Sequence, residues 1–171
     1  LYKGLSIKSF DDFIKLPVID KEHLYKNSPP ENKALFTTSR LKGVYFASGG
    51  STGKPKYVFY SHDEYSLVTE MLSKAYMHAG LCDGDIVANL FVSGNLWSSW
   101  ISVERALSHT GVISIPIGSS LPVESIVNYL KEFRVNVIVG LPSYLLRVAD
   151  YVEKNRIKLG INKIFYGGEY I

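Results

Sequence analysis

The segment of residues 48–56, Ser-Gly-Gly-Ser-Thr-Gly-Lys-Pro-Lys, constrains this chain of 171 residues more than any other part of its sequence. Its glycines let the backbone adopt left-handed conformations and approach a ligand without a Cβ clash. Its hydroxyl, ammonium and amide donors can converge on one anion. Residues 43–47 and 57–60 on either side are rich in β-branched and aromatic side chains, which favours strands. The sequence therefore predicts a phosphate-binding loop between the two strands of a hairpin.

This loop differs from the P-loop of ATPases and GTPases. That motif has four residues between its first glycine and a Gly-Lys pair, which Ser or Thr follows. Here three residues separate Gly49 from Gly53, and Pro55 follows Lys54. Proline has no N–H and fixes φ, which argues against a helix continuing through this point. A plain glycine-serine surface turn is the alternative interpretation.

Strand and helix patterns alternate after the hairpin. This alternation predicts an α/β fold with a mostly parallel sheet built from βαβ units. We expect strands over residues 85–91, 112–115, 135–139 and 161–166, and helices over residues 63–79, 97–108, 122–133 and 143–155. The apolar positions that recur at helical spacing in the first of these helices are Leu67, Val68, Met71, Leu72, Ala75 and Tyr76.

The part of the chain before the hairpin is expected to be helical. Ser9 is a suitable N-cap for a helix over residues 10–15, and Asp20 for a second short helix. The chain therefore divides into a helical lead-in (1–41), the phosphate-loop hairpin (42–61) and βα repeats (62–171).

Ligands of parallel sheets bind outside the carboxyl ends of the strands. Residues 93–95, 140–142 and 167–169 each follow an expected strand, so we expect these three segments to meet at one edge of the sheet. Ser143 lacks the Gly-x-Ser-x-Gly pattern of hydrolase nucleophiles and is interpreted as a helix N-cap. Trp100 is interpreted as a core residue.

The composition excludes several classes of protein. The net charge of +3, without a basic stripe, does not favour a nucleic-acid partner. The single cysteine and four histidines show no metal-ligand spacing, so we expect no metal ligands in the chain. No apolar run reaches the roughly 20 residues that cross a bilayer, and no signal peptide is visible. We therefore expect a cytoplasmic protein without a membrane partner.

The loop at residues 48–56 resembles the ATP phosphate-binding loop of the adenylate-forming superfamily of acyl- and aryl-CoA synthetases, whose signature is approximately Ser-Gly-Thr-Thr-Gly-x-Pro-Lys. The continuation through residues 60–63 is more similar to the phenylacetate–CoA ligase branch. Residues 13–22, 140–144 and 164–169 also resemble segments of that branch, in the same order along the chain. The resemblance spans most of the sequence and implies that the chain is an incomplete N-terminal, AMP-binding domain.

The resemblance also implies roles for individual residues. The loop would contact the β- and γ-phosphates of ATP, and the turn after the last strand would lie near the adenine, although a simple strand-ending turn is the alternative there. The nucleotide-binding residues implied in this way are Ser48, Gly49, Gly50, Ser51, Thr52, Gly53, Lys54, Gly167, Gly168 and Glu169. Trp97 and Trp100 stand where that branch has a His-Tyr pair beside the acyl substrate, and the substrate-binding candidates are Asn95, Trp97 and Pro142.

The activity implied by the resemblance is ATP-dependent activation of a small carboxylic acid to acyl-AMP, followed by thioester formation with coenzyme A. Mg²⁺ would assist, with its ligands mostly outside this chain. The family's Tyr-Gly-x-(Thr/Ser)-Glu motif and catalytic lysine are missing from the sequence, so we expect the catalytic residues beyond Ile171 and an inactive fragment. An exposed sheet edge would then favour self-association. The alternatives are a non-catalytic adenylation-like protein and an unrelated α/β module that binds simple phosphates.

Overall fold

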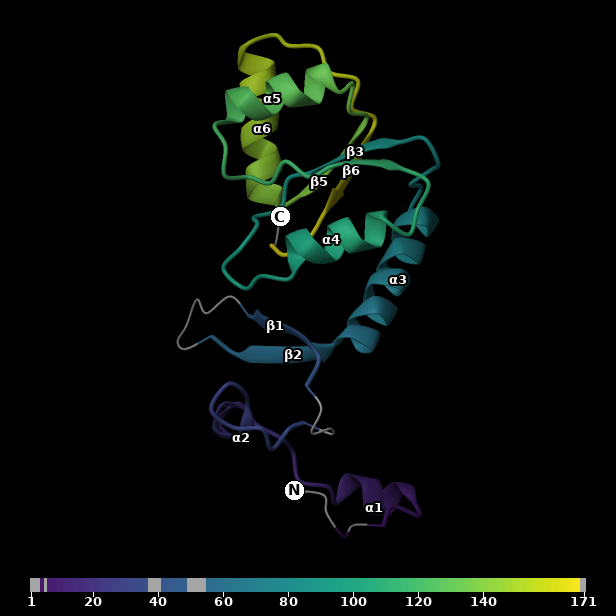
Figure 1. Cartoon of the computed structure of the whole chain (residues 1–171), viewed down its shortest axis with the longest axis vertical. Helices are drawn as coiled ribbons and strands as arrows, with labels where there is room; N and C mark the ends of the chain where they lie inside the picture. Colours follow the sequence, from purple (N-terminus) through teal and green to yellow (C-terminus); the bar gives the residue numbers. More distant parts are fainter. Residues whose placement is uncertain (1–3, 5, 37–40, 49–54, 170–171) are drawn as a thin grey trace.

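The computed structural model describes residue 4 and residues 6–36, 41–48 and 55–169. Within them the chain forms a four-stranded parallel sheet between helices, an antiparallel hairpin, and two short N-terminal helices (Figure 1). The expected α/β fold with a mostly parallel sheet is confirmed. The division at residues 41 and 61 stays a prediction.

The sheet contains β3 (Ile86–Asn89), β4 (Ile113–Ile115), β5 (Val137–Gly140) and β6 (Lys163–Tyr166) in the order β4-β3-β5-β6. All three neighbouring pairs are parallel. The helices α4 (Ser99–Leu107), α5 (Val123–Glu132) and α6 (Pro142–Lys154) connect successive strands. These connections are the expected βαβ units. The strands are shorter than the apolar runs that predict them; β3, for example, ends at Asn89 rather than at residue 91.

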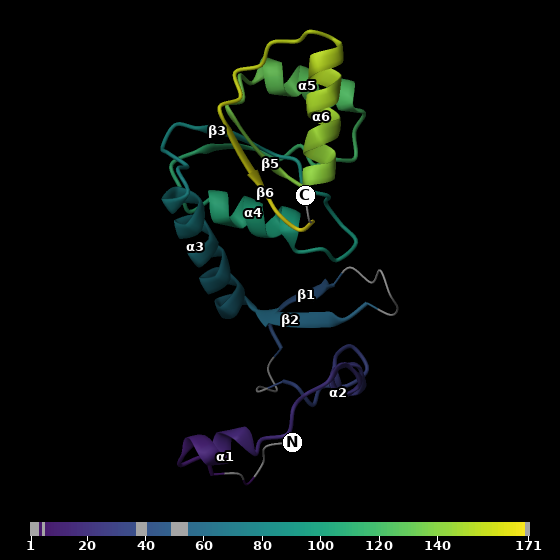
Figure 2. The same cartoon turned by 180° about the vertical axis from the view of Figure 1, so that it is seen from behind.

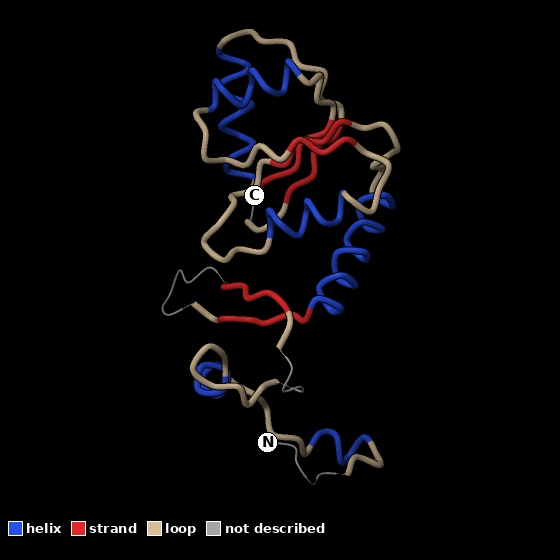
Figure 3. Tube along the Cα trace, in the orientation of Figure 1, coloured by secondary structure: helices blue, strands red, loops and turns tan. Residues whose placement is uncertain are grey.

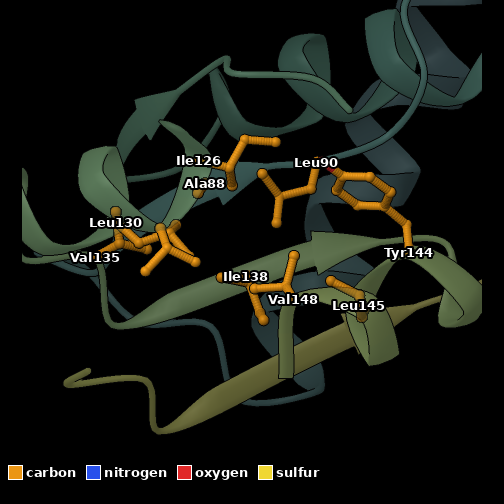
Figure 4. Packing of buried hydrophobic residues seen from close by; sticks show 10 residues of the cluster. Ala88, Leu90, Ile126, Leu130, Val135, Ile138, Tyr144, Leu145 and Val148 are labelled. Atoms are coloured by element: carbon orange, nitrogen blue, oxygen red, sulfur yellow. The ribbon is translucent and has the colours of Figure 1, made fainter. Parts of the chain in front are cut away.

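Helices cover both faces of this sheet. Alternate side chains of β3 and β5 point to opposite faces, so each face packs against its own helices. Ala88 and Ile138 pack with α5 and α6, and Figure 4 shows this cluster from close by. Val87, Val137 and Val139 pack on the other face with side chains of α4 and with Leu81. The tube in Figure 3 shows the resulting layers, with the sheet between the two groups of helices.

The hairpin consists of β1 (Gly43–Ala47) and β2 (Tyr57–Ser61), paired from Gly43 opposite Ser61 to Ala47 opposite Tyr57. It continues directly into α3 (His62–His78), which packs along α4. Phe46 of β1 is buried, with its ring centroid 5.1 Å from that of Tyr65 in α3. The hairpin therefore lies beside α4, on the side away from the sheet (Figure 2).

The two short N-terminal helices are confirmed with their caps. Ser9 forms a capping box with Asp12 at the start of α1 (Phe10–Ile14), and the Asp20 carboxylate accepts the N–H of His23 in α2 (Lys21–Asn27). Neither helix has a buried residue, and both lie at the far end of the molecule from the sheet (Figure 1).

Two expectations about helices are wrong. The N-cap of α6 is Leu141 rather than Ser143, which lies within the first turn because Pro142 already starts the helix. The helix expected over 97–108 also begins later than expected, since α4 starts at Ser99 and Trp97 precedes it.

The last strand, β6, lies at one edge of the sheet in the part of the chain described. Ile164 and Tyr166 on this strand are more than half exposed. Self-association through this edge stays a prediction.

Candidate functional site

A pocket of about 560 Å³ lies where the carboxyl ends of β5 and β6 face the hairpin and the helices α3 and α4. We call it the sheet-edge pocket. Its volume falls within the range of small-molecule sites, roughly 300–1,000 Å³. It is lined by Ala47, Ser48, Leu72, Tyr76, Phe91, Trp97, Ser98, Ser99, Ser102, Val103, Leu141, Gly167, Gly168 and Glu169.

The pocket collects several of the residues that the sequence singled out. Ser48 at the start of the predicted phosphate loop, Trp97, and the turn at residues 167–169 all line it. Pro142 does not line it; this residue is buried as the first residue of α6, and its neighbour Leu141 faces the pocket instead. The roles assigned to these residues stay predictions.

The base of the predicted phosphate loop is closed by two hydrogen bonds between Ser48 and Lys56. The N–H of Ser48 donates to the carbonyl oxygen of Lys56 at 2.9 Å, and the N–H of Lys56 donates to Ser48 Oγ at 3.2 Å. Gly49, Gly50, Ser51, Thr52, Gly53 and Lys54 lie outside the described residues. The two ends of the loop are therefore held together at the rim of the sheet-edge pocket.

A second pocket, of about 420 Å³, lies beside the hairpin and shares Ala47, Ser48 and Trp97 with the first. We call it the hairpin pocket. Its other lining residues are Pro55, Tyr57, Asn95 and Leu96. The indole of Trp97 thus contributes to the walls of both pockets, and Asn95 belongs to the second pocket only.

The turn before Trp97 has an unusual backbone. Asn95 and Leu96 have φ angles of 52° and 58°, in the left-handed region that a residue such as leucine rarely adopts. The carbonyl oxygen of Leu96 accepts a hydrogen bond from the N–H of Ala47 at 2.8 Å. This bond joins the turn after β3 to the last residue of β1, directly before the phosphate loop.

The turn after β6 contains a glycine that the fold requires. Gly168 has a φ of +89°, and a Cβ at this position would lie 3.0 Å from Leu141 Cδ2. The backbone of Gly167 and Gly168 consequently lines the pocket without side chains of its own. Glu169 turns toward α6, where its Oε2 accepts the N–H of Ser143 at 3.0 Å. Hydrogen bonds from the hydroxyl and the N–H of Ser143 lower the pKa of Glu169.

The aromatic wall of the pocket was missed by the sequence reasoning. Tyr76 of α3 packs edge-on against Phe165 of β6, with ring centroids 5.2 Å apart, and burial raises the pKa of Tyr76 to about 12. Phe91 and Val103 are buried in the same cluster. Trp100 packs against this cluster as expected, and its indole N–H is buried without a hydrogen-bond partner among the described residues.

Hydroxyl groups on α4 were also missed. Ser98, Ser99 and Ser102 line the pocket from the start of this helix. Their spacing of three and four residues places them on one helical face, a signal that the sequence does carry. The sequence alone does not show that this face meets α3 and the turn after β6.

Residues 6–36, 41–48 and 55–169 contain no group of three side chains that could hold a metal ion together. Within the same residues no helix is both long and apolar enough to span a membrane.

Known proteins similar to this chain are CoA ligases and related enzymes. No family model matches the chain. It is 27% identical over 148 residues to a phenylacetate-coenzyme A ligase of Pseudomonas putida. This match covers 86% of this chain and 33% of that protein. It is 25% identical over 171 residues to an indoleacetate–lysine synthetase of Pseudomonas savastanoi, covering 98% of this chain and 42% of the synthetase.

Solved structures show the same fold. One of them is an open conformation of 2-hydroxyisobutyryl-CoA ligase in complex with 2-HIB-AMP and CoA, which is 20% identical to this chain and has a TM-score of 0.80. The match covers 95% of this chain and 39% of the ligase chain. A long-chain-fatty-acid-CoA ligase of Archaeoglobus fulgidus matches 66% of this chain with a TM-score of 0.56. The chain spans about a third of the length of the curated ligases that it matches. It is therefore a homologue of the phenylacetate–CoA ligases and has the fold of the adenylate-forming CoA ligases.

Proposed function

We propose that this chain supplies the nucleotide- and acid-binding wall of an adenylate-forming acid–thiol ligase. In the first half-reaction a carboxylate oxygen would bond to the α-phosphorus of ATP while the bond to the pyrophosphate oxygen breaks. In the second half-reaction the CoA sulfur would bond to the acyl carbon and AMP would leave. The observation that carries this proposal is the sheet-edge pocket, which joins the rim of the phosphate loop to the turn after β6 in a homologue of CoA ligases.

The residues at the pocket fit a nucleotide in two respects. The bare backbone of Gly167 and Gly168 offers a flat surface to a purine ring. Ser48 adds a hydroxyl to the lining at the start of the loop whose Ser51, Thr52 and Lys54 would contact the β- and γ-phosphates. The bound ATP would supply the activated phosphoryl group. This chain would bind ATP, orient it, and hold the acid beside it.

In this proposal Mg²⁺ is bound through the phosphate oxygens of ATP. Magnesium in such sites is held by phosphate oxygens with one or two carboxylates. The described residues offer no cluster of carboxylates at the pocket. We assign Mg²⁺ no ligand in this chain.

Nucleotide binding tests the proposal directly. Both tryptophans of the chain lie at the pocket or pack against it, so their fluorescence should report ligand binding. We expect ATP to bind more tightly than inorganic triphosphate, because the adenine adds contacts. Thr52→Ala with Lys54→Ala should weaken ATP binding about tenfold or more, since charge-assisted hydrogen bonds are lost. Lys42→Ala removes one exposed positive charge at the other end of β1 and is the matched control.

The alternatives predict different outcomes. A module for simple phosphates would bind triphosphate as well as ATP. A decorative glycine-serine turn would leave ATP affinity unchanged in the double variant. A non-catalytic adenylation-like protein would bind ATP normally but show no exchange of pyrophosphate into ATP in its full-length form. We propose that the 171-residue chain alone also shows no exchange, because its sequence lacks the motifs that the resemblance assigns to catalysis.

A further inference from the structure

The side chain of Tyr65 in α3 contacts residues on two successive turns of α4. Its side chain is only 2% exposed, and its hydroxyl oxygen lies 2.9 Å from Ser102 Oγ. The guanidinium carbon of Arg105, one turn further along α4, lies 4.7 Å from the centre of the Tyr65 ring. Because these contacts come from a buried ring, they fix the position of Ser102 on α4.

Either hydroxyl can donate in the hydrogen bond between Tyr65 and Ser102, and the burial of Tyr65 favours it as the donor. A buried O–H that finds no acceptor loses free energy, so the hydroxyl proton of Tyr65 must be donated. Ser102 Oγ is its hydrogen-bond partner in the described part of the chain. With Tyr65 as the donor, the hydroxyl proton of Ser102 is left for another acceptor. Burial raises the pKa of Tyr65, so this donor stays protonated at neutral pH.

Ser102 lines the sheet-edge pocket in largely apolar surroundings. The other lining residues from α3, from α4 and from its N-cap are Leu72, Tyr76, Ser98, Ser99 and Val103. The residues suited to phosphate and purine, Ser48 and the turn at 167–169, come from the hairpin and from the end of β6. Ser102 thus belongs to the part of the lining that comes from α3 and α4, which suits the hydrocarbon portion of the acid.

We infer that Ser102 is a specificity-determining residue that selects aromatic acids carrying an acceptor oxygen, such as a ring hydroxyl, over the same acids without it. The aromatic walls formed by Tyr76, Phe91 and Trp97 favour a flat ring. An oriented donor within such walls discriminates, because an unsubstituted ring leaves that donor unpaired, and Ser102 accompanies the other two pocket hydroxyls at the start of α4, Ser98 and Ser99. This inference rests on the proposed function, since it places the acid in the sheet-edge pocket.

The test compares phenylacetate with the ortho, meta and para hydroxyphenylacetates, titrated into the chain with tryptophan fluorescence as the readout. We expect at least one hydroxylated isomer to bind about fivefold more tightly than phenylacetate, the gain typical of one neutral hydrogen bond. Ser102→Ala should remove this difference, because it removes the donor that an unsubstituted ring leaves unpaired. The control Ser108→Ala changes an exposed serine at the end of α4, whose hydroxyl bonds to the carbonyl of Arg105, and should keep the difference.

Two further measurements separate the possible failures. The variant Tyr65→Phe keeps the ring under Arg105 but removes the donor to Ser102, and it should reduce the preference for the hydroxylated isomer. AMP affinity should not change in Ser102→Ala. Equal binding of all the acids by the wild type, or a preference that survives Ser102→Ala, would overturn the inference and leave the proposed function standing. Failure of both AMP and every acid to bind would overturn both.

Discussion

The ammonium of Lys163 lies 2.6 Å from Asp85 Oδ2 and so joins the start of β6 to the turn before β3, two strands away. Asn136, which precedes the intervening strand β5, donates its amide to the other carboxylate oxygen at 2.8 Å. Asn136 Oδ1 in turn accepts the N–H of Ile86 at 2.7 Å. This group of side chains ties three strands together at the end of the sheet opposite the pocket, where the strands begin.

Asp85→Asn should destabilise the fold. The carboxylate is 7% exposed and would leave Lys163 without its partner, so we expect a loss of about 2–3 kcal/mol in unfolding free energy, measured by urea denaturation. Asp83→Asn, at an exposed neighbouring position, is the control and should change little. Equal stability of Asp85→Asn and wild type would show that the bridge does not contribute.

The same carboxylate predicts a dependence on pH. Burial acts to raise the pKa of Asp85, but hydrogen bonds from Lys163, the Cys82 N–H and Asn136 outweigh it, and the pKa is lowered. A lowered pKa stabilises the folded state above the unfolded value of about 3.9 and loses this effect as the pH falls through the folded value. The stability difference between wild type and Asp85→Asn should therefore be constant from pH 5 to 8 and shrink below about pH 4. A difference that grows on acidification would contradict this sign.

Asn89→Ala tests the polar contacts between the sheet and α4. Asn89 is fully buried, and its amide donates to the Trp100 carbonyl at 3.0 Å and to Glu104 Oε1 at 2.7 Å. Removing it leaves two partly buried acceptors with fewer donors, so we expect a loss of about 2–3 kcal/mol in chemical denaturation. The exposed Asn155 bonds to a helix-end carbonyl, and Asn155→Ala should cost less than about 1 kcal/mol. A cost for Asn89→Ala no larger than that of the control would be inconsistent with this role.

The strands and the edge of the sheet that carries the pocket could be predicted from sequence because their signals are local. Short apolar runs bounded by turn residues identify β3 and β5. Once the strands are known to be parallel, the segments after them must lie at one edge. The pocket walls could not be predicted in this way, since Tyr76 and Ser102 reach the pocket only through the packing of α3 on α4.

The orientation of α3 shows where the hydrophobic pattern misleads. Leu67 and Met71 form part of its apolar stripe, yet they are 59% and 63% exposed in the described structure. The buried face instead carries Tyr65, Thr69 and Ser73. The hydroxyls of Thr69 and Ser73 bond to carbonyl oxygens of their own helix, so they can be buried without loss of hydrogen bonds. Hydrophobic periodicity ranks such residues as polar and therefore includes the exposed Leu67 and Met71, although Leu72 and Tyr76 of the same stripe do line the pocket.

Ser61→Ala should weaken the start of α3. Ser61 Oγ accepts the N–H of Glu64 at 3.2 Å, and the Ser61 N–H donates to Glu64 Oε2 at 2.8 Å, which together form a capping box. Loss of such a cap typically costs about 1 kcal/mol, which thermal unfolding should show as a lower Tm. Ser9→Ala breaks the same motif at α1, which buries no residue, and should leave the Tm nearly unchanged. Equal shifts for the two variants would mean that α3 does not unfold together with the core.

Glu169→Ala should loosen the turn that we propose to lie against the adenine. The carboxylate holds this turn on the first residues of α6 through Ser143, and Glu169 lines the pocket together with Gly167 and Gly168. We therefore expect adenosine affinity to fall a few-fold, with a Tm close to that of the wild type. Glu153→Ala, an exposed glutamate at the other end of α6, is the matched control. Because the pKa of Glu169 is lowered, the affinity ratio between wild type and Glu169→Gln should stay constant from pH 5 to 8 and approach one only below about pH 4. An unchanged adenosine affinity in Glu169→Ala would show that the turn needs no anchor, whereas a large fall in Tm would show that the contact stabilises the whole fold rather than the site.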